Sequence, residues 1–199
     1  MNLMITGGRD AAQLYKRWMK ANVLSSIPKF LDLFLTDERC VPRSHSDSNY
    51  HLIMEQLFAG KLPQDVAFHR IYGEAADLQV EACRYEQLLP ASVDLLILSM
   101  GDDGHIASLF PGSSALYETE RKFVPVMGPK APFCRLTITP PVIRSAKRVY
   151  VLALGDKKRR KYEEALLDPE DISSIPARLV LDKTWIFDLD KEIDLCPKL

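Results

Sequence analysis

The sequence predicts an α/β protein with three layers, in which an open, mostly parallel sheet carries helices on both faces. Two observations support this fold class. Short apolar runs alternate along the 199-residue chain with longer stretches of helical periodicity, as expected for repeated strand and helix units. The run at residues 93–98 has an apolar residue at five of its six positions, which is typical of a strand buried on both faces of a parallel sheet.

The first predicted strand, residues 3–5, leads directly into Gly7 and Gly8. We expect Asp10 to cap the helix that follows. A strand, a glycine turn and a helix N-terminus can together bind an anion through backbone N–H groups. Two adjacent glycines on their own more often form a plain turn. The segment is therefore a candidate anion site that needs support from elsewhere in the chain.

The remaining elements follow in the same alternating order. After a strand at residues 30–36, Asp47 or Ser48 can cap a helix at residues 49–58. The later strands are short runs that end at glycine, proline or polar residues, and Pro140-Pro141 ends one of them. These later strands are residues 67–71, 93–98, 135–139, 148–154 and 184–188, and the later helices are residues 75–89, 142–146, 156–167 and 174–181.

Composition narrows the class of protein. A chain of 199 residues with 47% hydrophobic and 27% charged residues is typical of one globular domain, so we expect a single domain over residues 1–199. The formal net charge of −1 argues against a general nucleic-acid binder. The N-terminus has neither a basic segment nor an apolar run long enough for a signal peptide or a membrane span. Four cysteines without a CxxC pair favour free thiols in the cytoplasm over disulfides or a zinc site: Cys40, Cys83, Cys134 and Cys196.

The loop at residues 99–112 is the leading candidate for the chemistry. It follows the buried strand at residues 93–98, and ligands of parallel sheets collect beyond the carboxyl ends of the strands. The loop carries Asp103 and His105 among glycines. A histidine in this place can accept a proton near neutral pH.

A second polar loop follows the strand at residues 30–36 and contains Asp37 and Arg39. Charged residues at the carboxyl end of a strand favour a binding site more than charges on a helix face do. The alternative is a solvated loop in which aspartate and arginine pair with one another. A run of basic residues opens the helix predicted at residues 156–167, and one of its lysines can reach toward a bound anion.

Taken together, these segments resemble the 6-phosphogluconolactonases of the glucosamine-6-phosphate isomerase/6-phosphogluconolactonase family. The match covers nearly the whole chain in the right order, and the run DGHIASLFPG at residues 103–112 is highly specific. The other matching segments are residues 7–8, 36–49, 130–137, 155–158 and 175–177.

The resemblance implies a Rossmann-like open sheet and hydrolysis of 6-phosphoglucono-δ-lactone to 6-phosphogluconate, in the oxidative pentose phosphate pathway. It implies no metal and no organic cofactor, and a small phosphorylated sugar lactone as the partner. By their matching positions, His105 would be the base that activates water, and Asp103 would orient the imidazole or the water. The substrate-binding candidates are Gly7, Gly8, Arg39, Arg135 and Lys158 for the phosphate, with Thr6 as a further donor, and Asp37 for the sugar hydroxyls.

The sequence departs from the family pattern in its first loop and at its N-terminus. Arg9 and Asp10 stand where the family usually has serine or threonine followed by proline. Arg9 could replace the lost hydroxyl donor, whereas an inward-pointing Asp10 would repel phosphate. The family also usually has a helix and a strand before this point, so we expect a shortened N-terminus and a sheet edge that is bare or covered by a partner.

Two other functions compete with lactone hydrolysis. Ile106 is similar to the corresponding residue of the amino-sugar-phosphate isomerase/deaminases, but the segment Ser108–Pro111 lacks their glutamate, and Arg39 stands where they have tyrosine. A non-catalytic sugar-phosphate binding relative is the other alternative. The altered first loop favours such a binder, and the intact Asp103-Gly104-His105 opposes it.

Overall fold

The computed structural model describes residues 1–23 and 30–190. A six-stranded sheet in the order β4-β2-β1-β5-β8-β9 runs through the molecule, and neighbouring strands in it are parallel. The strands β4 and β9 form its edges. These results confirm the α/β class. The bounds in sheet order are β4 Val66–His69, β2 Leu31–Leu35, β1 Asn2–Ile5, β5 Leu95–Ser99, β8 Val149–Leu152 and β9 Thr184–Ile186.

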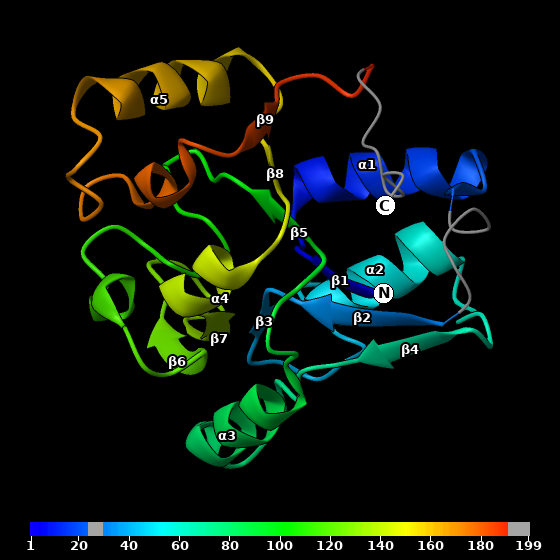
Figure 1. The fold of residues 1–199 in the computed structure, drawn as a ribbon. Helices are drawn as coiled ribbons and strands as arrows, with labels where there is room; N and C mark the ends of the chain where they lie inside the picture. Colours follow the sequence, from blue (N-terminus) through cyan, green and yellow to red (C-terminus); the bar gives the residue numbers. More distant parts are fainter. Residues whose placement is uncertain (24–29, 191–199) are drawn as a thin grey trace.

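Helices cover both faces of this sheet. The helices α1 (Arg9–Lys20) and α2 (Asn49–Phe58) lie side by side on one face. The helices α3 (Leu78–Leu88), α4 (Pro140–Ser145) and α5 (Asp156–Leu167) lie on the other side (Figure 1). The helices divide between the two faces because the connections between parallel strands are right-handed. The strand order runs outward from β1 toward β4 on one side and from β5 toward β9 on the other, so the connecting helices lie on opposite faces.

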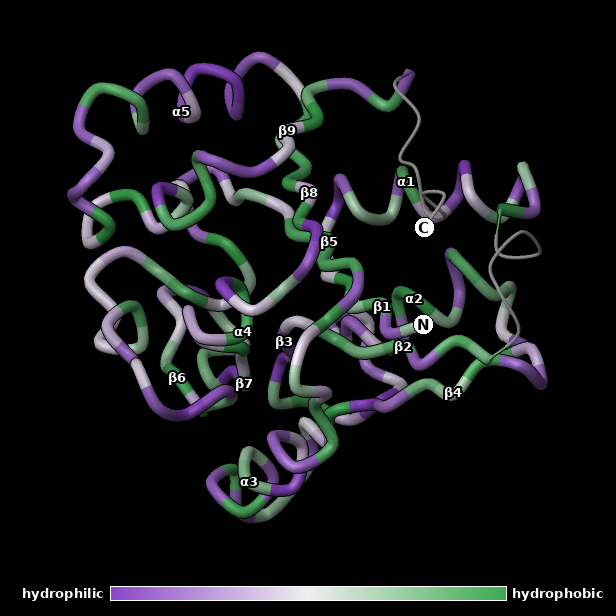
Figure 2. Tube along the Cα trace, in the orientation of Figure 1, coloured by the Kyte–Doolittle hydropathy of each residue, from purple (hydrophilic) through white to green (hydrophobic). Residues whose placement is uncertain are grey.

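The centre of the sheet forms the core. Residues 3–5 of β1 and 95–98 of β5 are fully buried, as the apolar run at residues 93–98 predicts. Figure 2 shows hydrophobic residues along the central strands and hydrophilic residues along much of α5. No helix among residues 1–23 and 30–190 is long and apolar enough to cross a membrane.

A second, antiparallel sheet lies beside the first and was not predicted as a separate sheet. Its order is β3 (Asp37–Arg39), β7 (Cys134–Ile138) and β6 (Phe123–Met127). The predicted strand at residues 135–139 is β7 of this sheet, whereas β3 and β6 were missed. The three residues of β3 are all charged, so no apolar pattern marks them as a strand; pairing with β7 holds them extended.

Thr36 joins the two sheets. It is the single residue between β2 and β3, and it is fully buried. Its N–H donates to the carbonyl of Ile5 in β1 at 3.0 Å, and its carbonyl accepts from the N–H of Ile138 at 2.8 Å. The backbone of one residue therefore bonds to both sheets.

Several helix starts differ from the predictions. Gly8, not Asp10, is the N-cap of α1, because Asp10 lies inside the first turn and bonds elsewhere. Pro140 opens α4 instead of only ending a strand, since proline suits a first helical turn. The N-cap Ser48 of α2 and the bounds of α5 are as predicted. The helix predicted at residues 75–89 begins at Leu78, where Asp77 accepts two backbone N–H bonds.

Candidate active site

A cavity of about 540 Å³ lies where the carboxyl ends of β1 and β5 meet the second sheet. All the residues predicted for the site line it: Gly7, Gly8, Asp37, Arg39, Asp103, His105, Arg135 and Lys158. A larger hollow of about 710 Å³ lies next to it and shares Asp103, Phe110 and Pro129. That hollow is lined by no lysine, arginine or histidine among the described residues, so it has no cation for an anionic ligand. The smaller cavity is therefore the candidate site.

Asp103 and His105 form a tight pair on the loop after β5. The Nδ1 atom of His105 lies 2.5 Å from Oδ1 of Asp103. Burial acts to raise the pKa of Asp103, but the hydrogen bond and charge of His105 outweigh it and lower this pKa from 3.8 to about 2. An ionised Asp103 can only accept, so Nδ1 carries a proton, and when the imidazole is neutral its lone pair is on Nε2. Among the described residues, Nε2 has no hydrogen-bond partner.

Gly101 makes room for this pair. A Cβ atom on Gly101 would lie 2.1 Å from Cε1 of His105 and 2.9 Å from Oδ1 of Asp103. The loop is closed on itself, since the N–H of Gly101 donates to the carbonyl of His105 at 2.8 Å. Phe110 packs on the imidazole with ring centroids 4.9 Å apart. The glycine thus allows the ring and the carboxylate to lie against the backbone.

Arg39 and Arg135 are direct neighbours on the second sheet, paired across β3 and β7. Arg39 donates from Nη1 to the carbonyl of Asp47 at 2.7 Å. Arg135 is buried, its Nη1 has no hydrogen-bond partner, and no carboxylate among the described residues forms an ion pair with it. Burial first, and then the charge of Arg39, lower the pKa of Arg135. Two adjacent guanidinium groups, one of them unpaired, make a strong site for an anion.

Lys158 lies in the first turn of α5 and already has a partner. Its Nζ donates to Oδ2 of Asp10 at 2.9 Å, and both side chains are buried. The N–H of Leu154 donates to the same oxygen at 2.9 Å. Asp10 is therefore paired with Lys158 instead of being an unpaired charge at the cavity. Lys158 lines the cavity as a cation whose charge is largely balanced.

The glycine turn after β1 is shaped by Gly8 and Gly7. Gly8 has a φ of 94°, a conformation that side chains rarely adopt. A Cβ atom on Gly7 would lie 1.9 Å from Oδ1 of Asn49. Because Gly8, Asn49 and Lys158 all line the cavity, the N-termini of α1, α2 and α5 meet at it. Helix N-termini favour bound anions.

Arg9, the departure from the family loop, is at the cavity rim. It lines the cavity, and its guanidinium lies 3.9 Å from Asp102, which also accepts from Lys157 at 2.8 Å. The Arg9 side chain is 87% exposed, so this ion pair holds it weakly. Arg9 is thus free to turn toward an anion.

Asp37 is held by its neighbours at the back of the cavity. One carboxylate oxygen accepts from the hydroxyl of Thr36 at 2.8 Å, and the other accepts from the hydroxyl of Ser108 at 2.7 Å. The N–H of Ser108 donates to Thr137 at 3.1 Å. These bonds tie the loop that carries His105 to the second sheet. Asp37 therefore contributes structure to the site in addition to any contact with a sugar.

Asn49 and Ser108 line the cavity but were not predicted as site residues. Asn49 is buried, its amide nitrogen donates to the carbonyl of Asp37 at 2.8 Å, and its Oδ1 has no hydrogen-bond partner. Both residues lie inside the segments that resemble the family, and this resemblance was the only indication in the sequence that they could belong to the site. Their polar atoms could be assigned to the cavity only from the fold.

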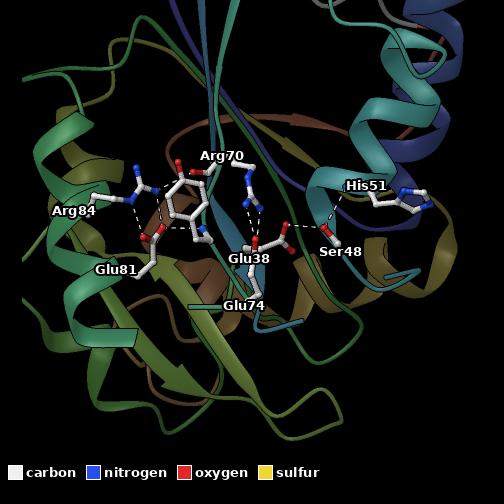
Figure 3. Close-up of polar contacts among 8 residues, drawn as sticks. Glu38, Ser48, His51, Arg70, Glu74, Glu81 and Arg84 are labelled. Atoms are coloured by element: carbon white, nitrogen blue, oxygen red, sulfur yellow. Dashed lines mark hydrogen bonds and ion pairs between the residues drawn. The ribbon is translucent and has the colours of Figure 1, made fainter. Parts of the chain in front are cut away.

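Glu38 fixes the start of α2, and with it Asn49. Its buried carboxylate accepts from the N–H groups of Asn49 at 2.7 Å and Tyr50 at 2.9 Å, and from the hydroxyl of Ser48 at 3.0 Å. Figure 3 shows the Glu38 and Ser48 side chains facing one another. Burial raises the pKa of Glu38, against the effect of these hydrogen bonds. This charged member of β3 is a capping group, not a ligand.

Among the described residues, no group of three or more His, Cys, Asp or Glu side chains could hold a metal ion. The cations that line the cavity outnumber its acids: Arg9, Arg39, Lys130, Arg135 and Lys158 against Asp37, Asp102 and Asp103. The cavity thus suits an anionic ligand.

Known proteins are similar to this chain in sequence and in fold. The family model for glucosamine-6-phosphate isomerases/6-phosphogluconolactonase matches residues 1–187. A 6-phosphogluconolactonase of Pseudomonas aeruginosa is 34% identical over 190 residues, covering 90% of this chain and 76% of that protein. A 6-phosphogluconolactonase of Borreliella burgdorferi is 31% identical over 184 residues, covering 88% of this chain and 77% of that protein. The crystal structure of a 6-phosphogluconolactonase from Shewanella baltica has a TM-score of 0.79 at 27% identity, covering 94% of this chain and 81% of that chain. The chain therefore belongs to the glucosamine-6-phosphate isomerase/6-phosphogluconolactonase family.

Proposed function

We propose that this chain hydrolyses 6-phosphoglucono-δ-lactone to 6-phosphogluconate, as a step of the oxidative pentose phosphate pathway. The relatives named above are 6-phosphogluconolactonases. One observation in this chain carries the proposal: a single cavity contains both a histidine with a free Nε2 and a buried, unpaired guanidinium beside a second one. Lactone hydrolysis needs a base for water, and a phosphorylated substrate needs cations.

His105 is the general base in this proposal. Its Nε2 takes a proton from water as the water oxygen attacks the carbonyl carbon of the lactone. When the tetrahedral intermediate collapses, the bond from that carbon to the ring oxygen breaks, and the imidazolium returns the proton to the ring oxygen, which becomes a hydroxyl. Asp103 stabilises the imidazolium and holds the ring in the tautomer that leaves Nε2 free.

The phosphate of the substrate binds at the cationic side of the cavity. Arg39 and Arg135 supply charged donors in a planar geometry that suits phosphate oxygens. Gly7 and Gly8 supply the N-terminus of α1, and Lys158 adds charge from the first turn of α5. Asp37 is the proposed partner of the sugar hydroxyls. Holding the phosphate at a distance from the carbonyl carbon positions the lactone for attack.

The acids around the cavity weigh against an amino-sugar-phosphate isomerase/deaminase. The described residues that line it include three aspartates and no glutamate, and Phe110 packs on His105 in the segment where a deaminase would carry its acid. Ring opening and proton transfer between sugar carbons would lack that carboxylate. Lactone hydrolysis does not need it.

An assay on the purified chain tests the proposal. Glucose-6-phosphate dehydrogenase generates the lactone in place, and the loss of lactone is compared with its spontaneous rate. We expect acceleration by the wild-type chain, and a fall of about 10²–10⁴ in kcat for His105→Ala. Binding of 6-phosphogluconate without any acceleration would favour the non-catalytic relative. Full activity of a folded His105→Ala chain would refute the role of the base.

We also infer a cytoplasmic location. Cys40, Cys83 and Cys134 are free thiols, as expected in a reducing compartment; Cys196 lies outside the described residues.

A further inference from the structure

Gly73 packs directly on the backbone that carries Arg39. It belongs to the loop after β4, which leaves the parallel sheet on the same side as the cavity. A Cβ atom on Gly73 would lie 2.3 Å from the carbonyl oxygen of Arg39, 3.0 Å from that of Val41 and 3.2 Å from the nitrogen of Val41. All three are backbone atoms, so no side chain can swing aside. Any larger residue must separate the two segments by about 1 Å to reach an ordinary contact.

The backbone around Arg39 is held by hydrogen bonds and strand pairing, which oppose its displacement. On its far side, Arg39 is paired with Arg135 across the second sheet. The Arg39 carbonyl already accepts from the N–H of Val41 at 2.8 Å, and its N–H donates to Glu38 at 2.7 Å. A push from Gly73 would therefore displace Arg39 itself, instead of being absorbed by a loose turn.

Helix α3 holds the Gly73 loop in place. Oε1 of Glu81, a buried side chain, accepts from the N–H of Tyr72 at 2.7 Å. The same carboxylate makes two 2.6 Å bonds with Arg84, whose Nη2 also donates to the carbonyl of Arg70 at 3.0 Å. Figure 3 shows Arg84 and Glu81 facing one another, with Arg70 and Glu74 paired nearby. Two backbone groups just before Gly73 in the chain are thus fixed to one helix.

Aromatic stacking strengthens this hold. The Tyr72 ring lies between two guanidinium groups, with its centroid 4.3 Å from Arg70 and 3.9 Å from Arg84. Arg70 in turn pairs with Glu74 through 2.5 Å and 3.2 Å bonds. Exposed ion pairs contribute little alone, but if Arg84 moved, the buried Glu81 would lose the one charged partner that it has among the described residues. The loop therefore has one well-defined position relative to α3.

We propose that Gly73, held by Glu81 and Arg84, is a positioning residue that sets the place of Arg39 in the cavity and so the affinity for the substrate phosphate. This inference rests on the proposed function of Arg39 as a phosphate ligand. It assigns a role in substrate binding to a cluster of residues that does not touch the cavity. A shift of about 1 Å in a binding group is enough to reduce binding strongly.

The test compares Gly73→Ala with Gly60→Ala by calorimetric titration with 6-phosphogluconate and by lactonase kinetics. Gly60 has a φ of 79° and its Cβ would meet nothing closer than 3.7 Å, so it controls for a general loss of stability without a clash near Arg39. We expect Gly73→Ala to raise the Kd and the KM about tenfold, with kcat within about twofold of wild type. Gly60→Ala should leave all three constants unchanged.

A double-mutant cycle shows whether the effect passes through Arg39. In an Arg39→Ala background, Gly73→Ala should raise the Kd no further, because the group that it displaces is gone. An equal rise in both backgrounds, or no rise in the wild-type background, would overturn the inference. So would an Arg39→Ala chain that binds 6-phosphogluconate as tightly as wild type does.

Glu81→Gln decides the matter if Gly73→Ala does not fold. The amide oxygen still accepts from Tyr72, but the charge that holds Arg84 is lost, so we expect a rise of about threefold in Kd that disappears in the Arg39→Ala background. An unchanged Kd in Glu81→Gln would then contradict the inference. Because the Kd is measured on the product, a wild-type chain that binds it without hydrolysing the lactone would refute the proposed function alone.

Discussion

Asp103 Oδ1 and His105 Nδ1 are 2.5 Å apart, in a loop that leaves the opposite ring nitrogen open to the cavity. The two side chains are only two residues apart, and Gly101 makes the space in which they meet. The arrangement defines the orientation of the ring before any substrate binds.

Replacing Asp103 with asparagine should lower kcat about 10²–10⁴-fold, since an amide stabilises neither the required tautomer nor the imidazolium. KM should change little. Asp102→Asn is the matched control, because Asp102 pairs with Lys157 and Arg9 instead of with His105. The coupled lactone assay measures both. Equal losses in the two variants would contradict the role of Asp103.

The same carboxylate should make stability depend on pH. Its pKa is about 2 in the folded chain, below the ordinary 3.8, so its ionised form stabilises the fold above pH 4. That contribution is lost as pH falls from about 4 to 2. Urea unfolding of wild type and Asp103→Asn should therefore give midpoints that differ at pH 6 and converge toward pH 2. A constant difference across this range would show that the ionised form is not favoured by folding.

Gly101→Ala should reduce kcat about 10²-fold, because the new Cβ would lie 2.1 Å from Cε1 of His105 and force the ring out of its position. Binding of 6-phosphogluconate should be affected much less. Isothermal calorimetry beside the coupled assay separates the two effects. Wild-type kcat in a folded Gly101→Ala chain would mean that the ring position seen here is not the catalytic one.

Breaking the buried pair of Asp10 and Lys158 should cost stability. Asp10→Ala leaves Lys158 unpaired, and we expect a loss of about 3–5 kcal/mol in the free energy of unfolding. The double variant Asp10→Leu/Lys158→Met should recover part of it, since two apolar side chains need no partner, although the N–H of Leu154 loses its acceptor. Urea denaturation at pH 7 checks this. The prediction fails if the double variant is as unstable as the single one.

Arg135→Met should have opposite effects on stability and binding. Removing a buried guanidinium with an unpaired Nη1 relieves a desolvation cost, so the free energy of unfolding should rise by about 1 kcal/mol. The Kd for 6-phosphogluconate should rise at least tenfold, because a charged hydrogen bond to phosphate is lost. Thermal unfolding and calorimetry measure the two changes. A variant that is both less stable and fully able to bind would show that Arg135 is a structural residue.

Local sequence patterns were enough to predict the parallel sheet and most helices. The apolar run of β5 and the periodic residues of α5 depend on neighbours within the same element. The strand β3 does not: its residues are held by β7, about a hundred positions later in the chain. Asp10 was likewise expected to cap its own helix, although its partner Lys158 is 148 residues away. Long-range pairing of polar residues leaves no local signal, and this is why β3 was missed and Asp10 was placed wrongly.

The same limit applies to the site. The family match predicted the site residues, and all of them line one cavity, including Arg39 and Arg135, which are paired across β3 and β7. It could not indicate that Lys158 has a carboxylate partner while Arg135 forms no ion pair with any carboxylate in residues 1–23 and 30–190. Because its charge is not balanced by a neighbouring carboxylate, Arg135 should be stabilised more by a bound phosphate than Lys158 is.

Thr36 has a consequence for how this cavity works. Thr36 is fully buried, its N–H bonds to Ile5 of β1, and the next residue begins β3, which carries Arg39. No flexible linker therefore separates the two sheets at this point. We therefore expect the two walls of the cavity to keep their relative position when a ligand binds. Selectivity for the ligand would then come from the preformed shape of the cavity, without a closing movement of its walls.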